Sequence, residues 1–222
     1  MTGNKIETLN QRIVEIETRM ETDGFFVNGA TYMDKWPQRK QSLDQIDEIR
    51  REISLLQGEE TALLLDWEYP WCAGAPIPHV VASAEKVYLI YRLRTFDPNW
   101  DGTSCRVITG KESDPAAVVE FIPCLGYRFV EYNDETHDEH PLFQRGLSYK
   151  NVHEIVNSHW IEEFQKKDIC VSGMKHYFFT FHDETFECIA KWHSVQVVKA
   201  TPFCDIVAQY ERLLNTQCAK GK

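Results

Sequence analysis

The sequence lacks any long apolar run. No stretch of its 222 residues approaches the roughly 20 consecutive apolar residues that a membrane-spanning helix needs. Its first twenty residues are charged throughout and contain no apolar core, so they do not match a secretory signal. We therefore expect a cytoplasmic protein that does not insert into a membrane.

Positive charge is also scarce, because 24 lysines and arginines face 34 aspartates and glutamates and the formal net charge is −10 at pH 7. A general nucleic-acid binder, or a protein that binds anionic membranes, needs a basic face. The charge balance argues against both classes and leaves room for basic protein partners. One weaker hypothesis is an acidic decoy that occupies a nucleic-acid-binding protein.

The common motifs of metal, cofactor and catalytic sites are missing. The seven cysteines are spread along the chain without a CxxC pair, which favours free thiols over a disulfide framework or a cysteine zinc site. There is no HExxH helix, no GxSxG elbow and no glycine-rich phosphate loop. The acidic segment His137–His140 contains metal-binding residue types, but adjacent residues on a loop do not define a preformed cavity. We expect neither a metal nor a cofactor.

Residues 1–58 show the three–four periodicity of amphipathic helices. The first helix is predicted over about residues 4–21, with an apolar stripe at Ile6, Leu9, Ile13, Ile16 and Met20. The second ends at Gly58 and has its stripe at Leu43, Ile46, Ile49, Ile53 and Leu56. Between them, Asn28-Gly29 predicts a small β-hairpin that includes residues 26–27 and 30–32. The two stripes can be buried on each other or on a second subunit, which favours a homo-oligomer.

Residues 59–222 read as a second, mainly β domain. Its predicted strands are Thr61–Trp67, Val87–Phe96, Cys105–Thr109, Val118–Ile122 and Tyr127–Tyr132, the last two joined as a hairpin about Pro123–Gly126. One helix is predicted near Tyr149–Lys167 and another after Thr201-Pro202, with an inner stripe at Phe203, Ile206, Tyr210, Leu213 and Leu214. The whole predicts an α+β protein: an N-terminal helical hairpin with a small β tip, followed by an antiparallel β-sheet flanked by two helices.

The clearest β signal is Lys175–Ser194, which reads as a hairpin about Asp183-Glu184. With this turn, Phe181 lies opposite Phe186, Phe179 opposite Cys188, and Tyr177 opposite Ala190, all on one face of the hairpin. We expect this face to point into the core.

The opposite face of the same hairpin carries His176, His182 and Glu187, with His182 diagonal to Glu187 across the strand pair. These three residues are the first candidate ligand-binding set. They can equally be satisfied polar groups on a partly covered sheet, because histidine often lies at the margin of a core.

A second candidate set combines aromatic and arginine side chains. Trp67 and Trp71 bracket a proline-rich segment, and Arg92 and Arg94 lie on the strand that follows. Aromatics and arginines together can clamp a planar anionic ligand such as a nucleotide. Alternatively, the two tryptophans anchor the core beneath a loop.

Two functional hypotheses follow from these observations. The first is a non-catalytic interaction protein that binds a protein partner or a small-molecule ligand and self-associates through its N-terminal helices. The second is a hydrolase-like enzyme that uses His176, His182 and Glu187, with or without a metal.

Overall fold

The computed structural model describes residues 2–22, 30–72, 74–84, 86–95, 111–130, 132–133 and 135–220, apart from the side chains of residues 30–34, 137 and 217–220. Its helices are α1 (Thr2–Thr22), α2 (Ala30–Gln57), α3 (His159–Lys166) and α4 (Phe203–Lys220), with short 3-10 helices η1 (His137–Glu139) and η2 (Phe143–Arg145). The strands are β1 (Thr61–Leu64), β2 (His79–Ala82), β3 (Val87–Arg92), β4 (Ala116–Val130), β5 (Val152–Val156), β6 (Lys175–Thr180) and β7 (Thr185–Val198).

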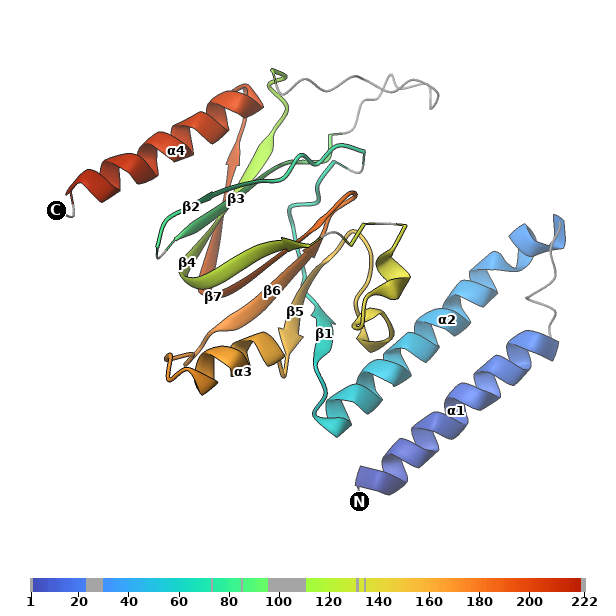
Figure 1. The fold of residues 1–222 in the computed structure, drawn as a ribbon. Coiled ribbons are helices and arrows are strands. Elements are labelled where there is room, and N and C mark those ends of the chain that lie inside the picture. The colour runs from blue at the N-terminus through green and yellow to red at the C-terminus, as the bar shows by residue number, and fades with distance from the viewer. Residues whose placement is uncertain are drawn as a thin grey trace.

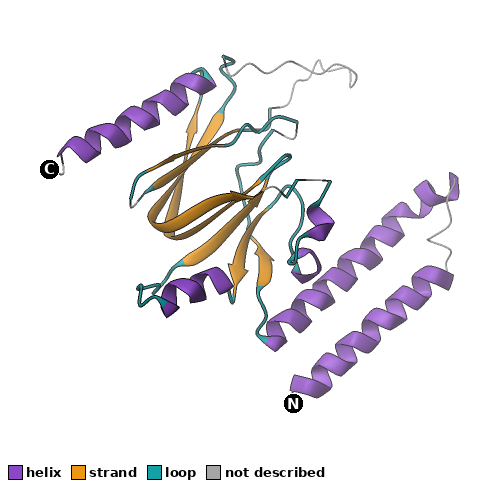
Figure 2. Ribbon diagram, viewed as in Figure 1, coloured by secondary structure: helices purple, strands orange, loops and turns teal. Residues whose placement is uncertain are grey.

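The strands of the described residues form one antiparallel sheet in the order β1-β5-β6-β7-β4-β3-β2. The α+β fold class is therefore confirmed (Figure 1, Figure 2). The strand order does not follow the sequence, because β1 pairs with β5 and β4 pairs with β7. The predicted strand at 105–109 lies outside the described residues.

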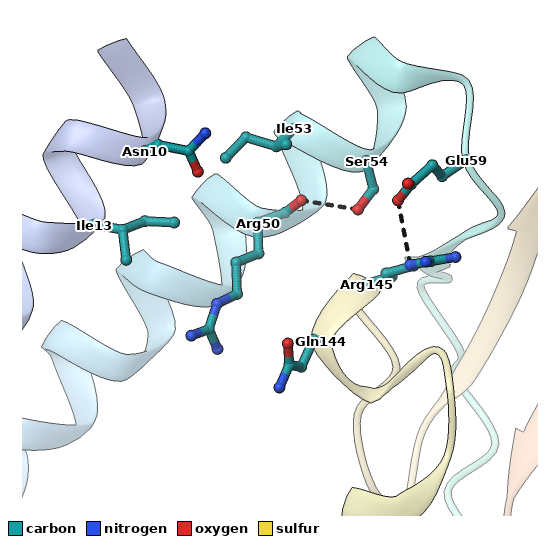
Figure 3. A pocket seen from close by; sticks show the side chains of 8 residues that line it. All are labelled: Asn10, Ile13, Arg50, Ile53, Ser54, Glu59, Gln144 and Arg145. Atoms are coloured by element: carbon teal, nitrogen blue, oxygen red, sulfur yellow. Dashed lines mark hydrogen bonds and ion pairs between the residues drawn. The ribbon is translucent and has the colours of Figure 1, made fainter. Parts of the chain in front are cut away.

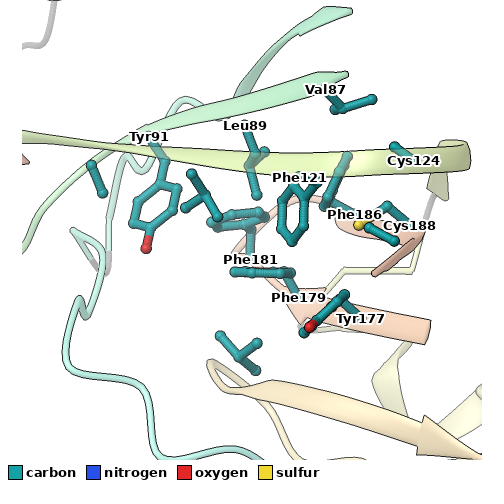
Figure 4. Packing of buried hydrophobic residues seen from close by; sticks show 14 of the residues in the cluster. Val87, Leu89, Tyr91, Phe121, Cys124, Tyr177, Phe179, Phe181, Phe186 and Cys188 are labelled. Atoms are coloured by element: carbon teal, nitrogen blue, oxygen red, sulfur yellow. The ribbon is translucent and has the colours of Figure 1, made fainter. Parts of the chain in front are cut away.

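The main core lies on one face of the sheet and is rich in aromatic rings (Figure 4). The side chains of Tyr177, Phe179 and Phe181 alternate into it from the β6 end of the central hairpin. Phe186, Cys188 and Ala190, entirely or almost entirely buried, enter it from β7. The predicted core face of the central hairpin is thus correct.

The predicted register of that hairpin is wrong by two residues. Phe179, and not Phe181, lies opposite Phe186, and Thr180 lies opposite Thr185. The turn is longer than two residues and is closed by a bond from the Phe181 N–H to the Glu184 carbonyl, at 3.0 Å. A two-residue shift leaves every side chain on its own face, because the strand period is two.

The helix α4 covers the opposite face at β2, β3 and β4 (Figure 1). Its buried residues Phe203, Ile206, Tyr210 and Leu214 match the predicted stripe, whereas Leu213 is 41% exposed. Tyr88 and Ile90 of β3 pack beneath these residues. No helix in the described part of the chain has both the length and the apolarity to cross a membrane.

The helices α1 and α2 form an antiparallel hairpin beside the sheet (Figure 1). Their stripes pack on each other within one chain through Leu9, Ile16, Met20, Ile46 and Ile49, whereas Leu43, which was expected in the second stripe, is 37% exposed. Residues 30–32, which were expected in a β-strand, belong to α2, and the expected turn at 28–29 lies outside the described residues. The helix α2 ends at Gln57, next to the predicted stop at Gly58, and the division of the chain into two domains stays a prediction.

Two further predictions of local structure are wrong. Residues 116–130 form one strand with a register irregularity between Cys124 and Gly126, not a hairpin. Pro123 stands next to this irregularity, where a missing ladder N–H is tolerated. Residues 149–167 form β5 and the short helix α3, because Asn157 adopts a positive φ of 52° and ends the strand before Ser158 caps the helix.

Candidate functional site

A buried polar network lies on the face of the central strands opposite the aromatic core. His176 Nε2 is 2.8 Å from Glu187 Oε2, between the adjacent strands β6 and β7. Arg128, paired with Glu187 in the β4–β7 ladder, donates from Nε to Oε1 at 3.1 Å and from Nη2 to Oε2 at 2.9 Å. Side chains from β6 and β4 thus both bind the carboxylate of Glu187 on β7, the strand between them.

The network continues from His176 to Ser158. The Ser158 Oγ is 2.9 Å from His176 Nδ1 and also accepts a hydrogen bond from the Ile161 N–H at 3.3 Å, as the N-cap of α3. The serine stands at a turn from strand to helix, directly after Asn157 in the left-handed conformation. Ser158, His176 and Glu187 therefore form one continuous chain of hydrogen bonds.

Trp160 of α3 covers this network. Its ring lies 4.5 Å from the Arg128 guanidinium carbon and 5.4 Å from the centre of the His176 ring, which it meets edge-on. His176 and Glu187 are each 2% exposed, whereas the Arg128 side chain is 51% exposed. Gly126 permits this close approach, because a Cβ there would lie 3.2 Å from the Trp160 ring.

The charges of the network follow from these contacts. Burial raises the pKa of the Glu187 carboxyl, but the hydrogen bonds and charges of His176 and Arg128 outweigh burial, so its pKa lies below the ordinary value. The carboxylate is therefore ionised at neutral pH. The carboxylate accepts a hydrogen bond from Nε2–H of His176, and in the tautomer with its proton on Nε2, Nδ1 is the acceptor for the Ser158 hydroxyl.

A pocket of about 310 Å³ opens beside the network, between α3 and the adjoining ends of β5 and β6. Ser158 is part of its lining, together with the apolar side chains of Ile155, Ile161 and Met174. Near the rim, Lys175 Nζ pairs with Glu154 Oε2 at 2.7 Å. The serine end of the hydrogen-bonded chain thus borders a space large enough for a small molecule.

A second pocket, of about 340 Å³, lies where the helical hairpin meets η2 (Figure 3). Arg50 and Arg145 bring positive charge to it, and Glu59 brings negative charge. Glu59 and Arg145 pair at 3.3 Å. Its polar uncharged lining comes from Asn10, Ser54 and Gln144.

The structure brings together only part of the first predicted set. His176 and Glu187 are partners, but His182 lies in the turn and its Nδ1 is 2.9 Å from Asp183 Oδ1. The expected neighbourhood of His182 and Glu187 is therefore wrong, because the longer turn carries His182 past the end of the paired strands.

The second predicted set is not assembled. Trp71 is buried in the aromatic core, and Trp67 packs against it and donates from Nε1 to the Tyr91 hydroxyl at 2.8 Å. Arg92 follows Tyr91 on the opposite side of the strand, is 2% exposed and pairs with Asp114. Arg94 is exposed. The two tryptophans are core anchors, and they do not share a face with Arg92.

Sequence reasoning missed Ser158, Arg128 and Trp160. A weak signal existed for the first, because Asn157-Ser158 precedes the helical pattern of α3 as a break and an N-cap. That signal was hidden by extending the predicted helix back to Tyr149. Arg128 and Trp160 carry no local signal, since they approach the network through strand pairing and helix packing.

No group of three or more histidine, cysteine or acidic residues that could hold a metal is present among the described residues. In the acidic segment, the Leu142 N–H donates to His140 Nδ1 at 3.1 Å, and the His140 ring packs on Tyr132 and Phe178. His140 is therefore packed against the sheet, not held in a fully solvated loop.

Comparison with known proteins gives no relative: no family model, curated protein or solved structure matches the chain. Function is therefore inferred from the geometry of this chain alone.

Proposed function

We propose that the chain is an interaction protein that binds a protein partner or a small ligand through its helical hairpin and the pocket at the base of that hairpin. One observation carries this proposal: the hairpin buries most of its two stripes internally and still presents large apolar side chains to solvent, including Leu43 of the second stripe. These are Val14, Trp36, Leu43 and Leu55, with Phe143 nearby in η2, exposed by 59%, 40%, 37%, 42% and 41%. Exposed apolar groups on a projecting element are typical of interaction surfaces.

The pocket at the base adds polar recognition to this surface. Arg50 and Arg145 can hold an anionic group, and Glu59 can accept hydrogen bonds or pair with a cationic group. Such a lining favours a ligand or peptide segment that carries both kinds of charge. The hairpin and the body both contribute residues, so a bound ligand would also link them.

Free cysteines support the cytoplasmic location that we propose. Those in the described residues, Cys72, Cys124, Cys170, Cys188 and Cys204, are all free thiols. Proteins of oxidising compartments more often use their cysteines in disulfides.

Self-association is the first test of the hairpin surface. Most of each stripe is buried within one chain, so a second copy would have to bind the outward residues. We therefore expect the Val14→Glu, Leu55→Glu double variant to remain monomeric when the wild type assembles. Sedimentation velocity at tens of micromolar, where an interface with a dissociation constant of about 1 μM is largely formed, measures this. A monomeric wild type at that concentration would refute self-association and leave a different partner.

Ligand binding at the base of the hairpin is tested by native mass spectrometry of the freshly purified chain. We expect a co-purifying small molecule whose bound fraction falls about tenfold or more in Arg145→Ala, because a hydrogen bond from a charged group contributes roughly 1.5–3 kcal/mol. The matched control is Arg212→Ala, an exposed arginine on α4. Equal occupancy in the two variants, or no bound molecule in the wild type, would count against this pocket.

A further inference from the structure

The chain of hydrogen bonds from Ser158 to Glu187 ends at a pocket, and interaction through the hairpin does not use it. We propose that Ser158, His176 and Glu187 are the nucleophile, the base and the orienting carboxylate of a second function, the hydrolysis of small esters bound between α3 and β6. This inference goes beyond binding by the hairpin and does not depend on it. It replaces His182 with Ser158 in the hydrolase hypothesis.

The geometry meets the requirements for an activated serine. The Oγ–Nδ1 distance of 2.9 Å and the Nε2–Oε2 distance of 2.8 Å both lie within the hydrogen-bond reach that such sets show. With Nδ1 as the acceptor, the hydroxyl donates its proton to His176, while the N-cap bond from the Ile161 N–H uses an oxygen lone pair. Capping and proton donation therefore occupy different parts of the same hydroxyl.

The support beneath His176 suits a general base. Glu187 is fixed by the two Arg128 hydrogen bonds and is buried, so it holds the imidazole in one tautomer and one orientation. Its negative charge stabilises the imidazolium that forms when the serine proton arrives. A serine that served only as a helix N-cap would need none of His176, Glu187 and Arg128.

The local backbone also suits a nucleophile. Ser158 lies between a strand and a helix, as in the nucleophile elbows of other hydrolases, although the flanking glycines of that motif are absent. In the first turn of α3, the N–H of Trp160 has no acceptor among the residues described, whereas those of His159 and Ile161 bond Glu60 and Ser158. We assign the Trp160 N–H to the oxyanion of the tetrahedral intermediate.

The reaction proceeds in two steps. In the first, Ser158 Oγ bonds to the ester carbonyl carbon, its proton moves to His176 Nδ1, and the bond to the leaving oxygen breaks as that oxygen takes the proton and departs as an alcohol. In the second, water gives a proton to Nδ1 and bonds to the acyl carbon. The Ser158–acyl bond breaks, the acid leaves, and the proton returns to Oγ. Ester and water thus become acid and alcohol.

The pocket indicates the substrate class. Its volume of about 310 Å³ admits a short acyl chain, and Ile155, Ile161 and Met174 offer an apolar wall. Lys175 is paired with Glu154, so no strong cationic site is offered to an anionic substrate. The net charge of −10 further disfavours anions. Uncharged esters of short carboxylic acids fit these features.

The test uses p-nitrophenyl butyrate and an alkyl fluorophosphonate on the full chain. We expect hydrolysis by the wild type to fall at least about 100-fold in Ser158→Gly, since the nucleophile is lost while glycine still serves as an N-cap. The matched control is Ser172→Ala, an exposed serine in the turn after α3, which should keep the wild-type rate. The fluorophosphonate should release fluoride and stay bound to Ser158, as located by peptide mass mapping.

Labelling of the wild type does not depend on how well a variant folds. Absence of label from Ser158, or a wild-type rate no higher than that of Ser158→Gly, would overturn the proposal. A label on another residue would overturn it as well, even if hydrolysis were observed. A label on Ser158 together with the loss of hydrolysis in Ser158→Gly would support it.

Discussion

Phe179→Ala should lower the free energy of unfolding by about 3–5 kcal/mol, the range found when a buried phenylalanine is truncated. Phe179 is fully buried, and its ring contacts Trp67, Phe121, Phe181 and Phe186 at centroid distances of 5.2–6.0 Å. Trp67 follows β1, Phe121 lies on β4, and Phe181 and Phe186 lie on the two sides of the central turn. Their positions are fixed by the surrounding strands, so the cavity left by the ring can collapse only in part.

Urea unfolding measures this loss through the midpoint and the slope of the transition. The matched control is Phe143→Ala in η2, where the ring is 41% exposed and the expected loss is under about 1 kcal/mol. A loss of under roughly 1 kcal/mol for Phe179→Ala as well would show that the aromatic cluster does not hold the sheet together.

Glu187→Gln should destabilise the protein by about 2–4 kcal/mol at neutral pH, because it removes the charge that His176 and Arg128 share. Removing one partner of a fully buried ion pair costs about 3–5 kcal/mol. Arg128 is half exposed, so water can solvate it in the variant and the expected loss is smaller.

The effect should depend on pH with a definite sign. The folded-state pKa of Glu187 is lowered, so its contribution is fully present above the ordinary carboxyl pKa of 4.5 and is lost as the pH falls through the folded value. The difference between wild type and Glu187→Gln in urea unfolding should therefore shrink from about pH 7 to about pH 3. His182→Ala, at the exposed turn, is the control and should change stability by less than about 1 kcal/mol. A pH-independent difference would mean that Glu187 acts through packing and not through its charge.

Sequence periodicity predicted those features that depend on one face of one element. The alternation of Tyr177, Phe179 and Phe181 predicted the core face of the central hairpin, and the three–four stripes predicted α1 and much of α2. The hairpin register was not predictable to the same degree, because Asp183-Glu184 lacks the glycine that fixes a two-residue turn. The predicted faces are still correct only because the register shift is an even number of residues.

Two secondary-structure elements were predicted wrongly because the local sequence suits more than one structure. Val152 and Ile155 are three residues apart, which is compatible with a helix, but they belong to the short strand β5, in which three of the five residues are β-branched. Pro123–Gly126 has the composition of a turn and lies within β4. In both places the pairing of distant strands overrode the local pattern.

The candidate site could be predicted only in part. His176 and Glu187 were predicted on the same face of the hairpin, so the alternation of side chains along the strands could predict their contact. Ser158 joins them from the cap of another element, and Arg128 from a strand far earlier in the chain. These residues form no recognisable motif in the sequence, because only tertiary packing brings them together.

The two central strands have a consequence for cooperativity. β4 and β7 run from the part of the sheet beneath α4 to the part beside α3, and both also contribute to the aromatic core. Each of these helices therefore rests in part on a strand that also reaches the other helix. Local opening that separated β4 from β7 would disturb both coverings and the core together, so the sheet should unfold as one unit, with fraying confined to its edges.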